Sequence, residues 1–467
     1  MKIYKTDDTN NKCEVETLTD GTTYYIYNCD GITCEAYSAQ NSNTEKTYVI
    51  YKNADDDKVE KVEEATTTDL YNPNDTGILL IYVDGAYKLV GNNGYYLNPD
   101  TTDTTAPLIQ CTVTDNVPTY SPISKTEVTA STAYYVDGSK FNNDSKYTQL
   151  ISCTVSSGNI SGCLSSQSEG YYINGGDKTK LIYCDSDKIC ETKAMANGYY
   201  INSGADNTTN KLIRCKDEGC STVAKTVDYY VDASNIVTGQ TNQYSKLIKC
   251  TTDGTCSNSD TLTENDNGYY VDELYNNGSG NYSHLIVCTT GLCESKSVTE
   301  GYFLNKATGT DEKPLISCSN GSCVKKDGVE GFYLNSGNTS SGTDSSGNAI
   351  IIYNGIINCS KSQVSDPLTC SPVDNLKDGF YLDASNINEA DGVVTYKGII
   401  NCIKNDDNSI SCDKENSVAD GYYMNGDKET TTDADGDERK YSGLIKCIVN
   451  NGATTSCELK TPNSGKY

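Results

Sequence analysis

The chain has 467 residues but no tryptophan, one histidine, three methionines and nine prolines. A Ser or Cys nucleophile is commonly activated by a neighbouring histidine, and this chain has only one histidine, His284. Because His284 directly precedes a predicted strand, we expect a structural role for it. Basic residues are few, since 37 Lys and Arg stand against 64 Asp and Glu, a net charge of −27. We therefore expect no nucleic-acid partner, because phosphate recognition needs clustered Lys and Arg.

Long apolar runs are also missing. No stretch approaches the roughly 18 apolar residues of a transmembrane helix, and the opening MKIYKTDDTN lacks the apolar core of a signal peptide. We expect no membrane partner for this sequence and interpret it as a fragment of a longer secreted protein. The hydrophobic share of 36 % is below the roughly 45–50 % of globular chains, which favours many small cores or one thin continuous core.

Cysteine is abundant, with 22 residues. That density in a long chain indicates an oxidising compartment and therefore an extracellular, secreted protein. Nine N-x-S/T sequons allow glycosylation there. They are Asn74, Asn143, Asn159, Asn207, Asn277, Asn281, Asn320, Asn338 and Asn358.

Two short motifs alternate along the chain. The first is Gly-aromatic-aromatic-aliphatic-Asn/Asp. It begins at Gly94, Gly170, Gly198, Gly268, Gly301, Gly331, Gly379 and Gly421, with variant first residues at Ala133 and Asp228. The second is Leu/Ile-Ile-x-Cys. It ends at Cys111, Cys153, Cys184, Cys215, Cys250, Cys288, Cys318, Cys359, Cys402 and Cys447. Ten copies of each in strict alternation indicate a tandem-repeat protein.

A second cysteine follows the first after a short, turn-rich segment, which predicts a β-hairpin stapled by its own disulfide. The pairs are Cys29/Cys34, Cys153/Cys163, Cys184/Cys190, Cys215/Cys220, Cys250/Cys256, Cys288/Cys293, Cys318/Cys323, Cys359/Cys370, Cys402/Cys412 and Cys447/Cys457. Structural zinc is the rival interpretation. Zinc needs four ligands at fairly fixed spacing, whereas a hairpin turn tolerates the drift from four to ten intervening residues.

Two cysteines remain unassigned. Cys13 resembles the second cysteine of a repeat in which Lys5 replaces the first, and the partner of Cys111 is missing. They either pair with each other or stay reduced. The predicted organisation is a truncated repeat and first hairpin over 1–34, degenerate repeats over 35–93, and about ten repeats in one continuous array over 94–467.

Within 35–93 we expect two eroded repeats. TYVIYKN, from Thr47, resembles the aromatic motif, and LLIYVDGAYKL, from Leu79, resembles a hairpin with Val83 in the cysteine position. An acidic loop is predicted at Asp55–Glu64.

Both motifs favour strands, because Tyr, Phe, Ile and Val suit a half-buried pleated surface. In Leu181–Cys184, Ile182 and Cys184 share the expected inner face and residue 183 faces away. No segment shows sustained helical periodicity. One repeat buries too little to fold alone, so stacking and disulfides must support it. The predicted fold is all-β: an elongated, solenoid-like array of short strands and stapled hairpins with almost no helix.

The paired aromatics are the candidate binding feature. One interpretation is packing, with one ring in the core and the other covering the adjacent repeat. The alternative is an outward ladder for sugars or for aromatic groups of a partner, in which linked weak sites gain avidity. The candidate partner-binding residues are Tyr96, Tyr135, Tyr172, Tyr200, Tyr230 and Tyr270.

We expect no enzyme, no cofactor and no metal site. The cysteines are committed to pairs, and no acid recurs in successive repeats except the Asn/Asp that ends the aromatic motif, which suits a strand-ending turn. DADGDE at Asp433 resembles a calcium loop only loosely, because Gly436 falls fourth and Leu444 twelfth, where an EF-hand has Gly sixth and Glu twelfth. A solvated loop is the preferred interpretation.

The alternation of GYY(I/L/V)(N/D) with LIxC and a second Cys is similar to the repeats of the large scaffoldins of anaerobic gut fungi. The resemblance covers nearly the whole chain and is weakest over 35–93. It implies a non-catalytic, cell-surface scaffold of the fungal cellulosome, whose repeats bind the dockerin modules of plant-cell-wall-degrading enzymes. Which residues contact a dockerin does not follow from it. Two alternatives stay open: a carbohydrate-binding or adhesive surface protein, and a passive structural spacer.

Overall fold

The computed structural model is all-β, as predicted. It describes residues 2–5, 24–29, 34–36, 48–52, 59–64, 77–83, 86–98, 106–115, 117–142, 146–204, 211–224, 228–259, 262–307, 313–343, 346–363, 365–390, 393–415, 418–432, 439–441, 443–450 and 452–461. Within these residues there is no α-helix. The helical turns are short 3-10 segments: η2 (Gly138–Lys140), η3 (Ala233–Asn235), η4 (Glu264–Asp266), η5 (Glu273–Tyr275) and η6 (Gly426–Lys428).

By its internal contacts the chain divides into two units. Unit 1 is Met1–Thr226 with Asp253–Cys256, and unit 2 is Val227–Thr252 with Ser257–Tyr467. Each contains several consecutive repeats. Continuity of the array from one unit to the other stays a prediction.

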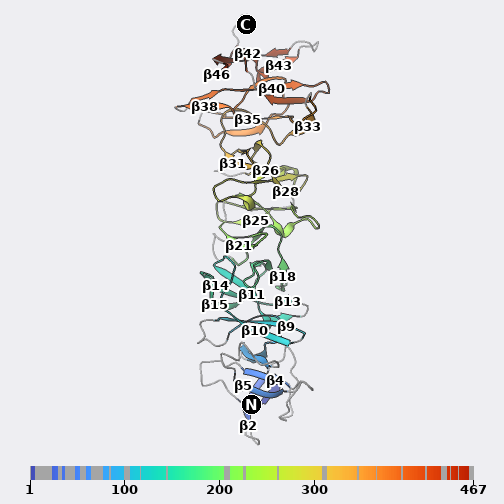
Figure 1. Cartoon of the computed structure of the whole chain (residues 1–467), viewed down its shortest axis with the longest axis vertical. Helices are drawn as coiled ribbons and strands as arrows, with labels where there is room; N and C mark the ends of the chain where they lie inside the picture. Colours follow the sequence, from blue (N-terminus) through green and yellow to red (C-terminus); the bar gives the residue numbers. More distant parts are fainter. Residues whose placement is uncertain are drawn as a thin grey trace. The chain divides into compact units, whose positions relative to one another are not determined.

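Each repeat is built on a three-stranded antiparallel sheet, drawn as short arrows in Figure 1. The aromatic motif forms the first strand: β8 (Gly94–Leu97), β11 (Thr132–Val136), β16 (Gly170–Ile173), β19 (Gly198–Ile201), β22 (Asp228–Val231), β26 (Gly268–Val271), β29 (Gly301–Leu304), β32 (Gly331–Leu334), β37 (Gly379–Leu382) and β42 (Gly421–Met424). The LIxC motif forms the central strand: β9 (Leu108–Thr114), β14 (Leu150–Ser156), β17 (Lys180–Cys184), β20 (Leu212–Lys216), β24 (Leu247–Cys250), β27 (His284–Thr289), β30 (Leu315–Ser319), β35 (Ile356–Ser360), β40 (Ile399–Lys404) and β45 (Leu444–Asn450).

The third strand contains the second cysteine in every described repeat from Ala133 onward, and in the Gly94 repeat it places Tyr120 opposite Cys111. These strands are β10 (Val117–Ile123), β15 (Asn159–Ser166), β18 (Cys190–Ala194), β21 (Gly219–Val223), β25 (Cys256–Asn258), β28 (Leu292–Ser297), β31 (Ser322–Lys326), β36 (Thr369–Pro372), β41 (Ile410–Lys414) and β46 (Ala453–Lys460). Further short strands come from the loops before the central strand: β12 (Phe141–Asn142), β13 (Lys146–Tyr147), β23 (Gln243–Tyr244), β33 (Thr339–Thr343), β34 (Ala349–Tyr353), β38 (Ile387–Ala390), β39 (Val393–Tyr396), β43 (Glu429–Thr432) and β44 (Arg439–Tyr441).

The register across these sheets is the same in every repeat. The first residue of the aromatic motif lies opposite the first cysteine. At Gly379 the backbone has φ +139°, and an added Cβ would lie 2.9 Å from the Cα of Gly426 in the next repeat. A side chain there is excluded both by the backbone conformation and by the close approach of the neighbour. This explains why glycine opens most copies of the motif.

The disulfide prediction is confirmed wherever the structure describes both side chains. The bonds are Cys153–Cys163, Cys184–Cys190, Cys215–Cys220, Cys288–Cys293, Cys318–Cys323, Cys359–Cys370, Cys402–Cys412 and Cys447–Cys457. Cys250 and Cys256 are also disulfide-bonded. Cys29 lies opposite Cys34 in the backbone register, but the side chains of this pair lie outside the described part. Each short closed loop restrains the unfolded chain by about 2 kcal/mol.

Successive repeats are joined by the aromatic pairs. The first ring of one repeat packs against the second ring of the next, with centroids 4.7–4.9 Å apart. The contacts are Tyr95–Tyr135, Tyr134–Tyr172 and Tyr171–Tyr200 in unit 1, and Tyr229–Tyr270, Tyr269–Phe303, Tyr302–Tyr333, Phe332–Tyr381 and Phe380–Tyr423 in unit 2. The first six contacts are tilted and the last two are T-shaped, and both are favourable ring geometries at this distance.

Backbone contacts also connect each repeat to the next at the same place. Tyr134 forms a parallel bridge to Asn174, and its carbonyl accepts a hydrogen bond from the N–H of Gly175 at 2.8 Å. Equivalent parallel bridges recur in both units. The Asn or Asp that ends each motif is a turn former, as predicted. In the Gly170 repeat, the Asn174 side chain accepts a hydrogen bond from the N–H of Gly176 at 3.0 Å.

Strands from the predicted truncated repeat over 1–34 and the predicted degenerate repeats over 35–93 form one sheet in unit 1. Its order is β1-β2-β7-β6-β4-β5, with β3 paired to β2. The strands are β1 (Lys2–Lys5), β2 (Tyr24–Cys29), β3 (Cys34–Ala36), β4 (Tyr48–Lys52), β5 (Val59–Glu64), β6 (Gly77–Val83) and β7 (Ala86–Leu89). The predicted hairpin is confirmed, with Val83 opposite Ala86. The predicted loop at Asp55–Glu64 is wrong over β5, an edge strand whose acidic residues suit an edge.

Tyr381 and Tyr422 test the role of repeat stacking. Tyr381 is 1 % exposed and donates a hydrogen bond to the carbonyl of Lys377, whereas Tyr422 in the Gly421 repeat is 48 % exposed. We expect Tyr381→Ala to lower the opening free energy of β37 and β40 by about 3–5 kcal/mol, and Tyr422→Ala to change it by about 0.5 kcal/mol or less. Native-state hydrogen exchange measures both, and equal effects would contradict the packing role.

Candidate binding grooves at the repeat junctions

The prediction of an outward ladder at the second aromatic position is wrong. Tyr96, Tyr135, Tyr172, Tyr200, Tyr230 and Tyr270 are all buried, with exposed fractions of 0–4 %. These rings fill the junctions between repeats, so the packing interpretation holds. No partner can reach them without separating the repeats.

The hydroxyl groups of several of these second tyrosines form hydrogen bonds within the protein, although that of Tyr135 is buried without a hydrogen-bond partner among the described residues. The hydroxyl of Tyr96 donates to the carbonyl of Asn92 at 3.0 Å and accepts from its N–H at 3.2 Å. Tyr270 and Tyr381 make the same donation to the residue four positions earlier. This bond fixes the entry into the first strand, which explains why tyrosine rather than phenylalanine occupies most copies of the position.

A further tyrosine, which sequence reasoning missed, forms a second connection between repeats. It stands three residues before the Leu or Ile that begins LIxC, and it pairs with the second cysteine of the next repeat. The pairs are Tyr147–Cys190, Tyr244–Cys293, Tyr282–Cys323, Tyr353–Cys412 and Tyr396–Cys457. In the Gly170 repeat Lys178 takes this position, and its carbonyl accepts from the N–H of Cys220 at 2.8 Å. The spacing Tyr-x-x-Leu/Ile-Ile-x-Cys was the available signal.

This tyrosine also reaches back to the preceding repeat. The hydroxyl of Tyr147 donates to the carbonyl of Asn93 at 2.9 Å, and that of Tyr396 donates to the carbonyl of Glu330 at 2.6 Å. Each of these side chains therefore contacts one neighbouring repeat while its backbone pairs with the other. The position of each such junction on the surface of its unit is therefore fixed by contacts with both neighbouring repeats.

Three grooves lie at such junctions, and each is lined by the second cysteine of the later repeat. The first, beside Lys178 and Cys220 in unit 1, has a volume of about 610 Å³. The second and third lie in unit 2 beside Cys412, with about 480 Å³, and beside Tyr396 and Cys457, with about 860 Å³. The first two grooves also contain the residues that flank the first cysteine of the same repeat, whereas the third contains Asn358 and Ser360, which flank Cys359 two repeats earlier.

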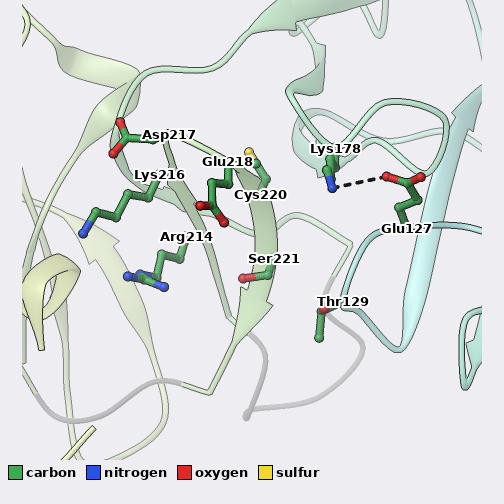
Figure 2. A pocket seen from close by; sticks show the side chains of 10 residues that line it. Glu127, Thr129, Lys178, Arg214, Lys216, Asp217, Glu218, Cys220 and Ser221 are labelled. Atoms are coloured by element: carbon green, nitrogen blue, oxygen red, sulfur yellow. Dashed lines mark ion pairs between the residues drawn. The ribbon is translucent and has the colours of Figure 1, made fainter. Parts of the chain in front are cut away.

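Charged side chains of both signs line the Lys178/Cys220 groove (Figure 2). Lys178 and Glu127 face each other with Nζ and Oε2 3.2 Å apart. Arg214 and Lys216 come from β20, and Glu218 lies in the turn that follows it. This lining suits polar or charged contacts.

The two grooves of unit 2 are more apolar. The Cys412 groove is lined by Ile350, Ile351, Ile352 and Ile403, together with Asp413, Lys414 and Glu415. Ile351 is 59 % exposed, although the chain as a whole is poor in apolar residues. Exposed aliphatic side chains gathered at one place are typical of interaction surfaces.

The remaining residues that could act in catalysis, the paired cysteines and His284, take part in structural contacts. The paired cysteines cannot act as nucleophiles while oxidised. The ring of His284 stacks on Tyr275 with centroids 3.6 Å apart. Within the described ranges, no group of three or more His, Cys, Asp or Glu is arranged to hold a metal ion. No helix in that part of the chain is long and apolar enough to cross a membrane.

Of the unassigned cysteines, Cys111 is buried, and its Sγ donates toward the carbonyl oxygen of Val90 at 3.6 Å. Tyr120, on the third strand of the same repeat, donates to that carbonyl at 2.8 Å. Cys13 lies outside the described residues. The tract DADGDE at Asp433–Glu438 lies outside them too.

Comparison with known proteins assigns no family. No protein-family model matches the chain, and no curated protein matches it. Among solved structures, a crystal structure of a protein from Lactobacillus plantarum aligns over 90 % of this chain and 96 % of its own length, with 8 % identity and a TM-score of 0.12. A likeness this weak supports no statement about fold or function.

Burial of the stacked rings predicts alkaline unfolding of the array. Desolvation raises the pKa of Tyr95 and of Tyr135 to about 12, whereas unfolded tyrosine titrates near 10. The stability these rings contribute is complete below pH ~10 and falls as the pH rises from ~10 to ~12. A pH-jump absorbance titration should show late tyrosinate ionisation that coincides with loss of structure. Ionisation of every tyrosine near pH 10 with the fold intact would contradict the burial.

Proposed function

We propose that this chain is a non-catalytic extracellular scaffold that holds several partner molecules at once. The observation that carries the proposal is the presence of three grooves, each beside the second cysteine of a repeat and each with a different lining. Repetition on a fixed framework gives avidity when partners are linked. Different linings allow different occupants.

The cross-linked framework supports this role. Every described repeat from Ala133 onward carries a disulfide-bonded cysteine pair, and neighbouring repeats within a unit are joined by ring contacts. Such a framework positions grooves without needing a large core. The disulfides are compatible with an oxidising, extracellular location.

The resemblance to gut-fungal scaffoldins suggests the partner class, namely dockerin modules of plant-cell-wall-degrading enzymes assembled into a cellulosome. The adhesive alternative rested on a surface ladder of tyrosines, and those rings are buried. Direct polysaccharide binding therefore has less support than protein docking. A passive spacer would not need grooves that differ in lining.

A pull-down with the chain immobilised tests the proposal. It is offered dockerin-bearing enzymes of an anaerobic gut fungus and, as the matched control, the same enzymes with the dockerin removed. We expect retention of the dockerin-bearing set alone, with more than one enzyme per chain by light scattering of the eluted complex. Equal retention of both sets, or of neither, would contradict the scaffold proposal.

A further inference from the structure

The Tyr396/Cys457 groove differs from the other two in its combination of apolar walls and charge. Val393 and Val394 come from β39, Leu459 comes from β46, Phe332 comes from β32 and Leu382 comes from β37. Val393 is 64 % exposed and Leu459 is 55 % exposed. Side chains of three successive repeats, those beginning at Gly331, Gly379 and Gly421, therefore line one groove.

The apolar walls are held in place by the junction itself. β39 pairs with β46 through Tyr396 opposite Cys457, and Cys457 is bonded to Cys447. The hydroxyl of Tyr396 is anchored on the carbonyl of Glu330. Exposure of Val393 and Leu459 is thus imposed by a fixed pairing, and an occupant would bury both without rearranging the backbone.

Every ionisable lining residue of this groove except the phenol of Tyr396 is a carboxylate: Glu330, Asp427 and Glu458. No Lys or Arg lines it, in contrast to the Lys178/Cys220 groove with three cations and the Cys412 groove with Lys414. Glu330 accepts a hydrogen bond from the N–H of Lys361 at 3.3 Å. Glu458 is paired with Lys460 at 2.8 Å. That ion pair is about half exposed, so a partner cation can replace it at small cost.

We propose that the Tyr396/Cys457 groove binds a short segment of a partner protein that carries apolar side chains beside Lys or Arg. The apolar side chains contact Val393 and Leu459, and the basic groups lie against Glu330, Asp427 and Glu458. This inference rests on the proposed scaffold function and names the chemistry of one of its partners. Charge complementarity fixes the orientation of the segment and speeds its encounter with an acidic chain.

The test uses the full chain and a labelled synthetic peptide that alternates Leu and Lys, followed by fluorescence anisotropy. One comparison peptide has Glu in place of Lys, and another has Ser in place of Leu. We expect only the Leu-Lys peptide to bind, with affinity that falls as salt rises. Equal binding of the Leu-Glu peptide or of the Ser-Lys peptide would overturn the proposal.

Substitutions in the groove test whether the peptide binds there. Val393→Ser combined with Leu459→Ser should weaken binding by about tenfold or more, the equivalent of about 1.4 kcal/mol, as should Glu330→Gln combined with Glu458→Gln. Leu164→Ser is the matched control, because Leu164 is 68 % exposed and lines none of the three grooves, and it should leave the affinity unchanged. Hydrogen exchange of β39 and β46 confirms that each variant is folded. Unchanged binding to the Val393/Leu459 variant, with its fold intact, would overturn the assignment.

The two experiments distinguish failure of this inference from failure of the scaffold proposal. Retention of dockerin-bearing enzymes by the chain, with no binding of the Leu-Lys peptide, would refute the chemistry assigned to this groove alone. Peptide binding without enzyme retention would refute the scaffold function alone.

Discussion

The contact between the first aromatic ring of one repeat and the second ring of the next is the interaction on which each unit depends. Among the residues that the structure describes, the ring centroids in these contacts lie 4.7–4.9 Å apart. Each contact adds about 0.5–1.5 kcal/mol beyond the area that it buries. Because a single repeat is too small to fold alone, the rings pack together with the buried Leu and Ile side chains of the LIxC strands to form the core. The disulfides restrict the chain around it. The glycine that opens the motif is required by the same close approach, since at Gly379 a Cβ would strike the backbone of Gly426.

Much of this fold could be predicted from sequence because it is local. The strands, the hairpins and the cysteine pairs lie within segments of some ten residues, where alternation and turn residues are informative. The strand at Val59–Glu64 was missed because its composition, VEKVEE, lacks a continuous apolar face. Its pairing with β4 outweighs a weak local preference.

The candidate site was harder to predict because it arises between repeats. Alternation correctly separates the faces of Gly170–Asn174, but it cannot reveal that the next repeat covers the second face. Alternation therefore leaves Tyr172 open to either packing or partner binding, and the structure packs it against Tyr134 of the preceding repeat. The tyrosine three residues before LIxC can be recognised by its spacing. Its partner is the second cysteine of the next repeat, however, which is more than 40 residues away in each pair described. The grooves depend on two connections between repeats, the ring contacts and the pairs of tyrosine and second cysteine. The residue pattern within a strand reveals neither.

The most direct test of the stacking account is a double-mutant cycle on Phe332 and Tyr381. Phe332→Leu, Tyr381→Leu and the double variant are compared by the opening free energies of β32 and β37 from native-state hydrogen exchange. The account predicts a coupling of about 0.5–1.5 kcal/mol between the two rings. The matched cycle pairs Phe332 with the exposed Tyr422 and should give additive effects. Additivity in the Phe332–Tyr381 cycle as well would contradict the claim that ring contacts hold successive repeats together.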